Sequence, residues 1–206
     1  MDLKIQKKID EFFTRFKYQK YKKGEILVRA DDDPPGIFYL KSGRVKEYAI
    51  SKKGDELVVN MFKPISFFPM SWAINNTPNM YFFEAIIDIE VWRAPKDKVL
   101  EFIKANPDVL CDLLSRVYRG TDGMMTRMTY LMAGNAYARL ITELIIHAKR
   151  FGNPLRISEK DLAASSGMTR ETISREMKTL KDKGLVSFQK NTLTIKNLKE
   201  LENELF

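Results

Sequence analysis

Cysteine and histidine are almost absent from this 206-residue sequence, which has one of each. A single cysteine, Cys111, cannot form an intramolecular disulfide or supply a cysteine-based zinc or four-cysteine iron–sulfur site, and we expect it to be buried filler. A single histidine, His147, makes His-based catalysis or a His-cluster metal site hard to build, and we expect a structural role for it. No glycine-rich phosphate-binding loop is present. We therefore expect no enzyme, no metal and no cofactor.

Long hydrophobic runs are missing too, since no apolar stretch approaches the roughly 18 residues that span a bilayer. Residues 1–13 carry charges throughout and lack the apolar core of a signal peptide. These absences predict a cytoplasmic protein without a membrane partner. Charge, in contrast, is unbalanced, because 35 Lys and Arg oppose 27 Asp and Glu to give a net charge of +8. Such a balance suits DNA, whose phosphates release counterions to bound cations, although a basic surface also aids solubility.

Residues 24–95 predict a β-rich region. Short runs of aromatic and β-branched residues alternate with turn sequences such as 31–36 and 51–54. Regularly spaced short strands indicate a barrel or sandwich. The strands we expect are 25–29, 37–40, 45–50, 56–62, 81–87 and 90–92. Residues 3–17 have apolar side chains at helical spacing, so we expect a helix on the outside of this barrel.

A long helix is expected over residues 106–134, with Asn106 as its N-cap and Gly134 as its stop. Apolar side chains at alternating steps of four and three form a narrow seam, which is typical of a coiled coil. The seam comprises Leu110, Leu114, Val117, Thr121, Met124, Met128 and Leu131. Gly120 and Gly123 each cost about 1 kcal/mol inside a helix, so the helix should not be stable alone. The seam favours a homodimer, and the alternative is a helix packed on its own barrel.

Residues 135–206 predict a second domain. Its expected elements are a helix over 136–150, two short helices, a hairpin of 185–188 with 192–195, and a last helix capped by Asn197. Ser158 and Asp161 have the spacing of a capping box at the first short helix. Gly167 supplies the left-handed residue that the next turn needs. This order of elements indicates a winged helix-turn-helix.

The second short helix carries a face suited to DNA. Thr169 caps it, and a stripe of Ile173, Met177 and Leu180 faces the core. The opposite face presents four base-reading candidates: Arg170, Glu171, Ser174 and Arg175. Arg can bridge guanine O6 and N7, and Glu can accept a hydrogen bond from cytosine N4. The candidates for DNA phosphate contacts are Thr169, Lys178, Lys181 and Lys190. An exposed helix can also carry Arg and Glu as a solvated ion pair, but the caps, the turn glycine and the wing together favour DNA binding.

These residues resemble the CRP/FNR family of bacterial transcription regulators over nearly the whole chain. Residues 169–175, Thr-Arg-Glu-Thr-Ile-Ser-Arg, are similar to the family's recognition element, Ser-Arg-Glu-Thr-Val-x-Arg. Residues 36–45 resemble its glycine-punctuated β-roll segment, and 106–108 resemble the entry to its dimer helix. The resemblance implies an α+β fold with a cyclic-nucleotide-binding-like β-roll (1–105), a dimerisation helix (106–134) and a winged helix-turn-helix (135–206).

The resemblance also implies partners and a mode of DNA binding. A homodimer on a palindromic operator in double-stranded DNA is expected, with RNA polymerase as a further partner. Arg170 follows the cyclic-AMP branch of the family, whereas Ser174 follows the oxygen-sensing branch. A TGTGA-like and a TTGAT-like half-site therefore both stay open. A non-specific DNA-binding architectural protein is the alternative function.

The effector is where the sequence departs from the family. The stretch 65–72 and then 79–81 lacks the carboxylate and the arginine that hold ribose and phosphate in the cyclic-AMP branch. We therefore expect no cyclic-nucleotide site, although Arg93 can still reach inward, and a cyclic-AMP-responsive regulator with a divergent pocket is the alternative. The region is aromatic instead, and it forms either a self-filled core or a pocket for an apolar small molecule. The pocket candidates are Phe67, Phe68, Trp72, Tyr81, Phe83, Met124, Met125 and Met128.

Overall fold

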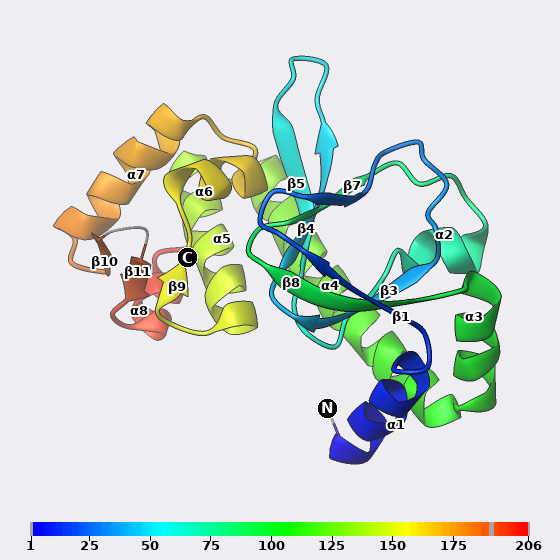
Figure 1. Cartoon of the computed structure of the whole chain (residues 1–206). Coiled ribbons are helices and arrows are strands. Elements are labelled where there is room, and N and C mark those ends of the chain that lie inside the picture. Colours follow the sequence, from blue (N-terminus) through cyan, green and yellow to red (C-terminus); the bar gives the residue numbers. More distant parts are fainter. Residues whose placement is uncertain (1, 190–191, 206) are drawn as a thin grey trace. The chain divides into compact units, whose positions relative to one another are not determined.

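The computed structural model describes residues 2–189 and 192–205, with the backbone alone for 130–133 (Figure 1). The chain divides into two compact units, residues 1–116 and 117–206. This boundary falls inside the long helix, and the three-part division at 105 and 134 stays a prediction. Within the described part of the chain, no helix is both long and apolar enough to cross a membrane.

Two four-stranded sheets form the first unit, with the orders β1-β8-β3-β6 and β2-β7-β4-β5. Neighbouring strands are antiparallel throughout. The strands are β1 (Lys17–Tyr21), β2 (Ile26–Val28), β3 (Ile37–Ser42), β4 (Val45–Ile50), β5 (Glu56–Phe62), β6 (Phe67–Phe68), β7 (Phe82–Ala85) and β8 (Ile89–Ala94). The helices are α1 (Leu3–Phe13), α2 (Met70–Asn75), α3 (Lys96–Ala105) and the first part of α4 (Pro107–Ala133). The predicted combination of a β-roll with outer helices is confirmed.

Strand β3 separates two hydrophobic cores. Because successive side chains of a strand point to opposite faces, Phe38 and Leu40 face the core between the sheets. Ile37 and Tyr39 face the other core, to which α1, α3 and α4 contribute. The Tyr39 hydroxyl donates to the Asp10 carboxylate on α1 at 2.5 Å. The continuous apolar run of β3 is therefore explained by burial on both faces.

Two glycines of the segment 36–45 are required by close backbone approaches. Gly36 has a φ of +140°, and a Cβ there would lie 2.5 Å from the Ala94 carbonyl oxygen. Gly43 has a φ of +92°, and a Cβ there would lie 2.5 Å from Cγ2 of Ile89. Both glycines therefore allow β3 and its following turn to lie directly against β8.

The start of the chain differs from the sequence prediction. The helix predicted over 3–17 ends at Phe13, and Lys17–Tyr21 form strand β1 instead. This strand pairs with β8, from Lys17 opposite Arg93 to Tyr21 opposite Ile89. The helical spacing of apolar residues is a local signal, and backbone pairing with a distant strand overrides it.

Helix α4 closely follows the range predicted for the long helix. Asn106 occupies the N-cap position, since its carbonyl accepts from the Leu110 N–H at 3.1 Å. Its side chain, however, donates to the Phe102 carbonyl at 2.8 Å instead of accepting from α4. A Cβ on Gly120 or Gly123 would have no atom within 4 Å other than the helix's own backbone. Cys111 is exposed, so the expectation that it is buried was wrong.

The second unit consists of short helices around a small sheet of order β10-β11-β9. Its elements beyond α4 are α5 (Ala136–Phe151), β9 (Leu155–Arg156), α6 (Glu159–Ser166), α7 (Arg170–Asp182), β10 (Val186–Gln189), β11 (Thr192–Ile195) and α8 (Leu198–Asn203). One hydrophobic core joins α5, α6, α7, α8 and the three strands. Asn197 caps α8 by accepting from the Lys199 and Glu200 N–H groups. This unit has the predicted winged helix-turn-helix order.

Candidate nucleic-acid interface

Local hydrogen bonds fix the start of α6 and the start of α7. The Ser158 hydroxyl accepts from the Asp161 N–H, and the Asp161 carboxylate accepts from the Ser158 N–H, both at 3.1 Å. Gly167 ends α6 in the left-handed conformation, with a φ of 65°. The Thr169 hydroxyl then accepts from the Thr172 N–H at 3.2 Å. The predicted capping box, turn glycine and second cap are all confirmed, and they set where α6 begins and ends and where α7 begins.

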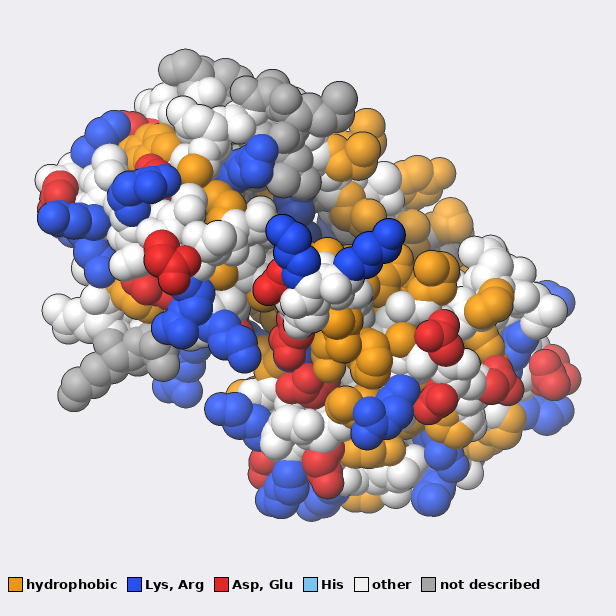
Figure 2. Space-filling view, turned by 90° about the horizontal axis from the view of Figure 1, so that it is seen from above, with side chains coloured by type: hydrophobic (Ala, Val, Ile, Leu, Met, Phe, Trp, Pro, Cys, Tyr) orange, Lys and Arg blue, Asp and Glu red, His pale blue; other side chains and the backbone are white. Residues whose placement is uncertain are grey.

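Helix α7 is anchored on one face and open to solvent on the other. Ile173, Met177 and Leu180 are each 0% exposed and join the core with α5. The four base-reading candidates all lie on the exposed face: Arg170, Glu171, Ser174 and Arg175. Figure 2 shows Lys and Arg side chains gathered over the part of the surface that carries α7, with fewer acidic side chains among them. The helix thus presents its polar face without giving up its packing.

The charge states on this face suit base recognition. A hydrogen bond from its own backbone N–H, and then one from Thr169, lowers the pKa of Glu171. Glu171 is therefore an ionised acceptor at neutral pH, as contact with a cytosine amino group requires. Arg175 Nε lies 3.1 Å from Oε1 of Glu176, but the Arg175 side chain is 70% exposed. An ion pair so exposed is weak, so the guanidinium is available to a base.

The phosphate candidates flank this face. Thr169, Lys178 and Lys181 are exposed, and Nζ of Lys181 lies 5.1 Å from the centre of the Phe188 ring on the wing. Lys190 lies outside the described residues. The Thr169 hydroxyl already accepts from the Thr172 N–H and donates to Glu171, so a phosphate contact would need its proton to turn away from Glu171. The roles of these residues in DNA binding stay predictions.

The wing is held by a residue that the sequence analysis missed. The Asn153 side chain donates to the Ile195 carbonyl at 2.7 Å and accepts from the Ile195 N–H at 3.0 Å. It thereby replaces the backbone partner that β11 lacks at this point. Asparagine is common in loops, so nothing in the sequence singled it out.

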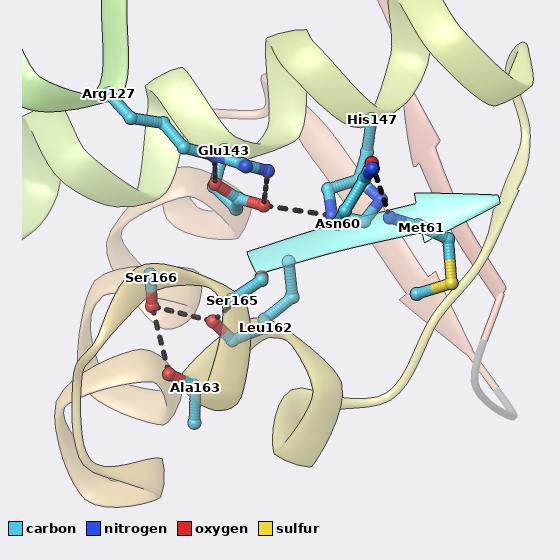
Figure 3. A network of polar contacts seen from close by, with 9 residues as sticks. All are labelled: Asn60, Met61, Arg127, Glu143, His147, Leu162, Ala163, Ser165 and Ser166. Carbon is cyan, nitrogen blue, oxygen red and sulfur yellow. Dashed lines mark hydrogen bonds and ion pairs between the residues drawn. The ribbon is translucent and has the colours of Figure 1, made fainter. Parts of the chain in front are cut away.

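A buried polar network, also missed, connects α4 with α5 inside the second unit (Figure 3). Arg127 of α4 donates to both carboxylate oxygens of Glu143, at 2.8 and 2.7 Å. His147 Nε2 lies 2.9 Å from the same carboxylate. Desolvation would raise the pKa of Glu143, but the hydrogen bond from His147 and the charge of Arg127 outweigh it and lower that pKa. The one available sequence signal was the four-residue spacing of Glu143 and His147 in an apolar helix.

The pocket candidates are divided between different places. Phe68 and Phe83 stack at 5.4 Å in the core between the sheets, and Tyr81 packs against that core. Phe67 and Trp72 belong to the other core, on the helix side of β3. The three methionines, Met124, Met125 and Met128, are 56–62% exposed on the part of α4 in the second unit. Phe68, Tyr81 and Phe83 therefore share the core between the sheets, Phe67 and Trp72 share the other core, and the methionines belong to neither.

The segment aligned with the phosphate site of the cyclic-AMP branch has little to offer an anion. The Asn79 amide donates to the Arg29 and Tyr81 carbonyls, each at 2.8 Å, which occupies both its protons. Met80 is 68% exposed and apolar. Arg93, opposite Phe38 across β3 and β8, lies on the face of the sheet that bounds the inter-sheet core. Arg93 is therefore the positively charged residue whose contribution to phosphate binding has to be tested.

The predicted seam is an exposed apolar stripe of α4. Leu110 and Leu114 are each 43% exposed, Val117 is 65% exposed, and Met124 and Met128 are 56% and 58% exposed. Thr121 is also exposed, and its hydroxyl donates to the Val117 carbonyl. The side chain of Leu131 lies outside the described ones. A contiguous stripe of exposed apolar side chains is typical of a protein–protein interface.

Comparison with known proteins accounts for both units. Residues 18–106 match the cyclic nucleotide-binding domain family, and residues 138–204 match the Crp-like helix-turn-helix domain family. The chain belongs to the CRP/FNR family. It is thus a DNA-binding transcription regulator of the CRP/FNR type, and its family is one of regulators, not of enzymes.

Individual relatives extend over most of this regulator. The global nitrogen regulator of Nostoc sp. is 25% identical over 191 residues, which cover 86% of this chain and 84% of the relative. The cAMP-activated global transcriptional regulator CRP of Haemophilus influenzae is 22% identical, with coverage of 91% and 87%. The structure of the c-di-GMP responsive regulator CLP of Xanthomonas campestris has a TM-score of 0.78 at 18% identity and covers 93% of this chain and 99% of its own. Similarity at this level shows a shared fold, but it does not identify the effector of this chain.

Proposed function

We propose that this CRP/FNR regulator controls transcription by binding, as a homodimer, to a palindromic operator in double-stranded DNA. The observation that carries the proposal is the exposed polar face of α7, where Arg170, Glu171, Ser174 and Arg175 lie opposite a fully buried stripe. Side chains at the N-terminal end of such a helix reach base edges in the major groove. RNA polymerase is the partner that a regulator would meet at its promoter.

The homodimer is supported by the exposed stripe of α4. A two-fold axis along two such helices would pack each seam residue against its counterpart and place the two α7 helices on successive turns of DNA. Half-sites one helical turn apart, about 34 Å, follow from that symmetry. A palindrome is therefore the operator that this dimer fits.

The effector of this regulator, in our proposal, is not a cyclic nucleotide. A buried phosphate needs a charged or multiply hydrogen-bonded partner, and the Asn79 amide protons are already used by backbone carbonyls. Phe68, Tyr81 and Phe83 fit a self-filled core or an apolar small molecule between the sheets.

The test is selection of an operator from random DNA, followed by gel-shift titration of two variants. Arg175→Ala should lose a bidentate guanine contact and weaken binding by about 1–3 kcal/mol per half-site, with relaxed preference at that base. Lys178→Ala, the matched control on the same exposed face, should weaken binding to all sequences evenly. Its salt dependence should fall by about one unit per subunit.

Selection that returns no consensus would favour the non-specific architectural protein instead. An Arg175→Ala variant that binds the selected operator as tightly as the wild type would show that the proposed base contact is wrong. A palindromic consensus also decides between TGTGA-like and TTGAT-like half-sites.

A further inference from the structure

The Arg127–Glu143 pair is more than a surface ion pair. The Glu143 side chain is 2% exposed and that of Arg127 is 23% exposed. Both oxygens of the carboxylate accept from the guanidinium, through Nε and Nη2. A bidentate pair fixes the orientation of both groups as well as their separation. Its geometry is therefore stiff.

The pair lies at a distance from the corner between two helices. Helix α4 ends at Ala133 and α5 begins at Ala136. At 1.5 Å per residue, about 9 Å of α4 separates Arg127 from the corner, and about 10 Å of α5 separates Glu143 from it. The two helices and the ion pair form a triangle, and a third side of fixed length sets the angle between the other two. The pair thus acts as a strut between α4 and α5.

Helix α4 carries the dimer seam, and helix α5 packs against the DNA-reading helix α7. Arg127 directly precedes Met128 of the seam. Leu140 and Leu144 of α5 share one core with Ile173 of α7. The angle between α4 and α5 is therefore transmitted to the position of α7 relative to the seam.

We infer that Arg127 and Glu143 are positioning residues that determine which half-site spacing the dimer accepts. The inference rests on the proposed function, since it needs a dimer on a two-part operator. In such a dimer, a change in the angle between α4 and α5 moves each α7 helix relative to the two-fold axis. Symmetry moves the α7 helix of the second subunit in the opposite direction. Without the strut the angle varies, and operators with different spacers become equivalent.

A role in overall stability would not account for the pair as well. Burying two charges costs desolvation that their attraction barely repays, so the intact pair adds little net stability, whereas removing one partner leaves an uncompensated buried charge. His147 also contacts the carboxylate, but it lies on α5 like Glu143 and cannot set an angle with α4. Repulsion from Arg127 contributes, after burial, to lowering the pKa of Arg150. Glu143 is thus the group that offsets these neighbouring positive charges and draws α4 toward α5.

The experiment measures the affinity of the dimer for the selected operator and for versions one base pair longer or shorter between half-sites. The wild type should prefer its own spacing by about tenfold or more, the size of one lost base contact. Glu143→Gln keeps the shape of the side chain but leaves the Arg127 charge unpaired, whereas the double variant Arg127→Gln with Glu143→Gln removes both charges of the pair. In both variants the preference should fall toward onefold. Arg119→Gln, an exposed arginine of the same helix, is the control and should keep the preference.

The readouts separate this inference from the proposed function. Circular dichroism and light scattering establish that each variant is folded and dimeric, and binding to a single half-site should be unchanged. Variants that retain the wild-type spacer preference would overturn the strut. A wild type with no spacer preference would overturn the palindromic dimer itself, and the strut with it.

Discussion

Glu47 is a carboxylate on the inner side of the β-roll. It lies on β4 directly opposite Phe83 of β7 and Asn60 of β5. Residues that face each other across strands share one face of the sheet, and Phe83 belongs to the core between the sheets. Burial raises the pKa of Glu47 to about 7, although a hydrogen bond with Asn60 opposes the shift. The fold thus prefers the protonated form.

The stability of the first unit should therefore fall as pH rises. The unfolded chain loses this proton near pH 4.5 and the folded protein near pH 7, so the penalty grows between these values and is constant above them. At 1.36 kcal/mol per unit it reaches about 3 kcal/mol. Glu47→Gln should raise the free energy of unfolding by about that much at pH 8 and by little at pH 4.5, measured in urea. Glu11→Gln on the exposed side of α1 is the control, and an equal gain at both pH values would contradict the prediction.

Residues that act on their own neighbours were predictable, and residues that act across the fold were not. Ser158, Asp161 and Thr169 bond to N–H groups within three residues, so their spacing alone revealed them. Asn153 and Glu143 have partners far along the chain or on another helix. No local pattern records such a partner.

The seam of α4 gives a direct test of the dimer at the scale of one element. Val117 and Met128 are 65% and 58% exposed in the single chain. Replacing both by Glu would bury four like charges in the interface, which is strongly unfavourable. The double variant should be monomeric by light scattering at micromolar concentration and should bind the operator weakly. Arg119→Glu, exposed and outside the seam, should remain dimeric, whereas an unchanged dimer in the double variant would rule out this interface.

Whole elements were predicted best where sequence signals agreed with tertiary pairing. Strands β4 and β5 match their predicted ranges at every residue, because turn residues 51–54 bound them on a hairpin. Strand β1 was missed, since its short sequence Lys-Tyr-Gln-Lys-Tyr is largely polar and only pairing with β8 makes it a strand. The candidate pocket failed similarly, because alternation along β6 sends Phe67 and Phe68 into different cores.

The response of the whole regulator to cyclic AMP is the test of the effector. Calorimetry with millimolar cyclic AMP should show no binding, and operator affinity should be the same with and without it. The reason is that no free donor of Asn79 remains for the phosphate. A ligand that binds the DNA-competent state better must raise operator affinity by the same factor. The two measurements therefore check each other.

Micromolar binding together with tighter operator binding would contradict this prediction. Arg93→Ala would then be the variant to measure, because Arg93 lies on the inner face opposite Phe38. Lys20→Ala, on the exposed side of β1, is its control. Loss of binding in Arg93→Ala alone would identify a divergent cyclic-nucleotide pocket.

The two glycines inside α4 would make operator binding by the proposed homodimer depend steeply on the concentration of the protein. Gly120 and Gly123 have open space where a side chain would be, and each weakens the helix by about 1 kcal/mol. A lone subunit is therefore expected to form this helix poorly, and contacts between the subunits of the proposed homodimer would stabilise it. Where pairing limits assembly, the concentration of dimers rises with the square of the concentration of subunits. A twofold rise in expression would then give a fourfold rise in dimer, so operator occupancy would rise more steeply than the amount of protein.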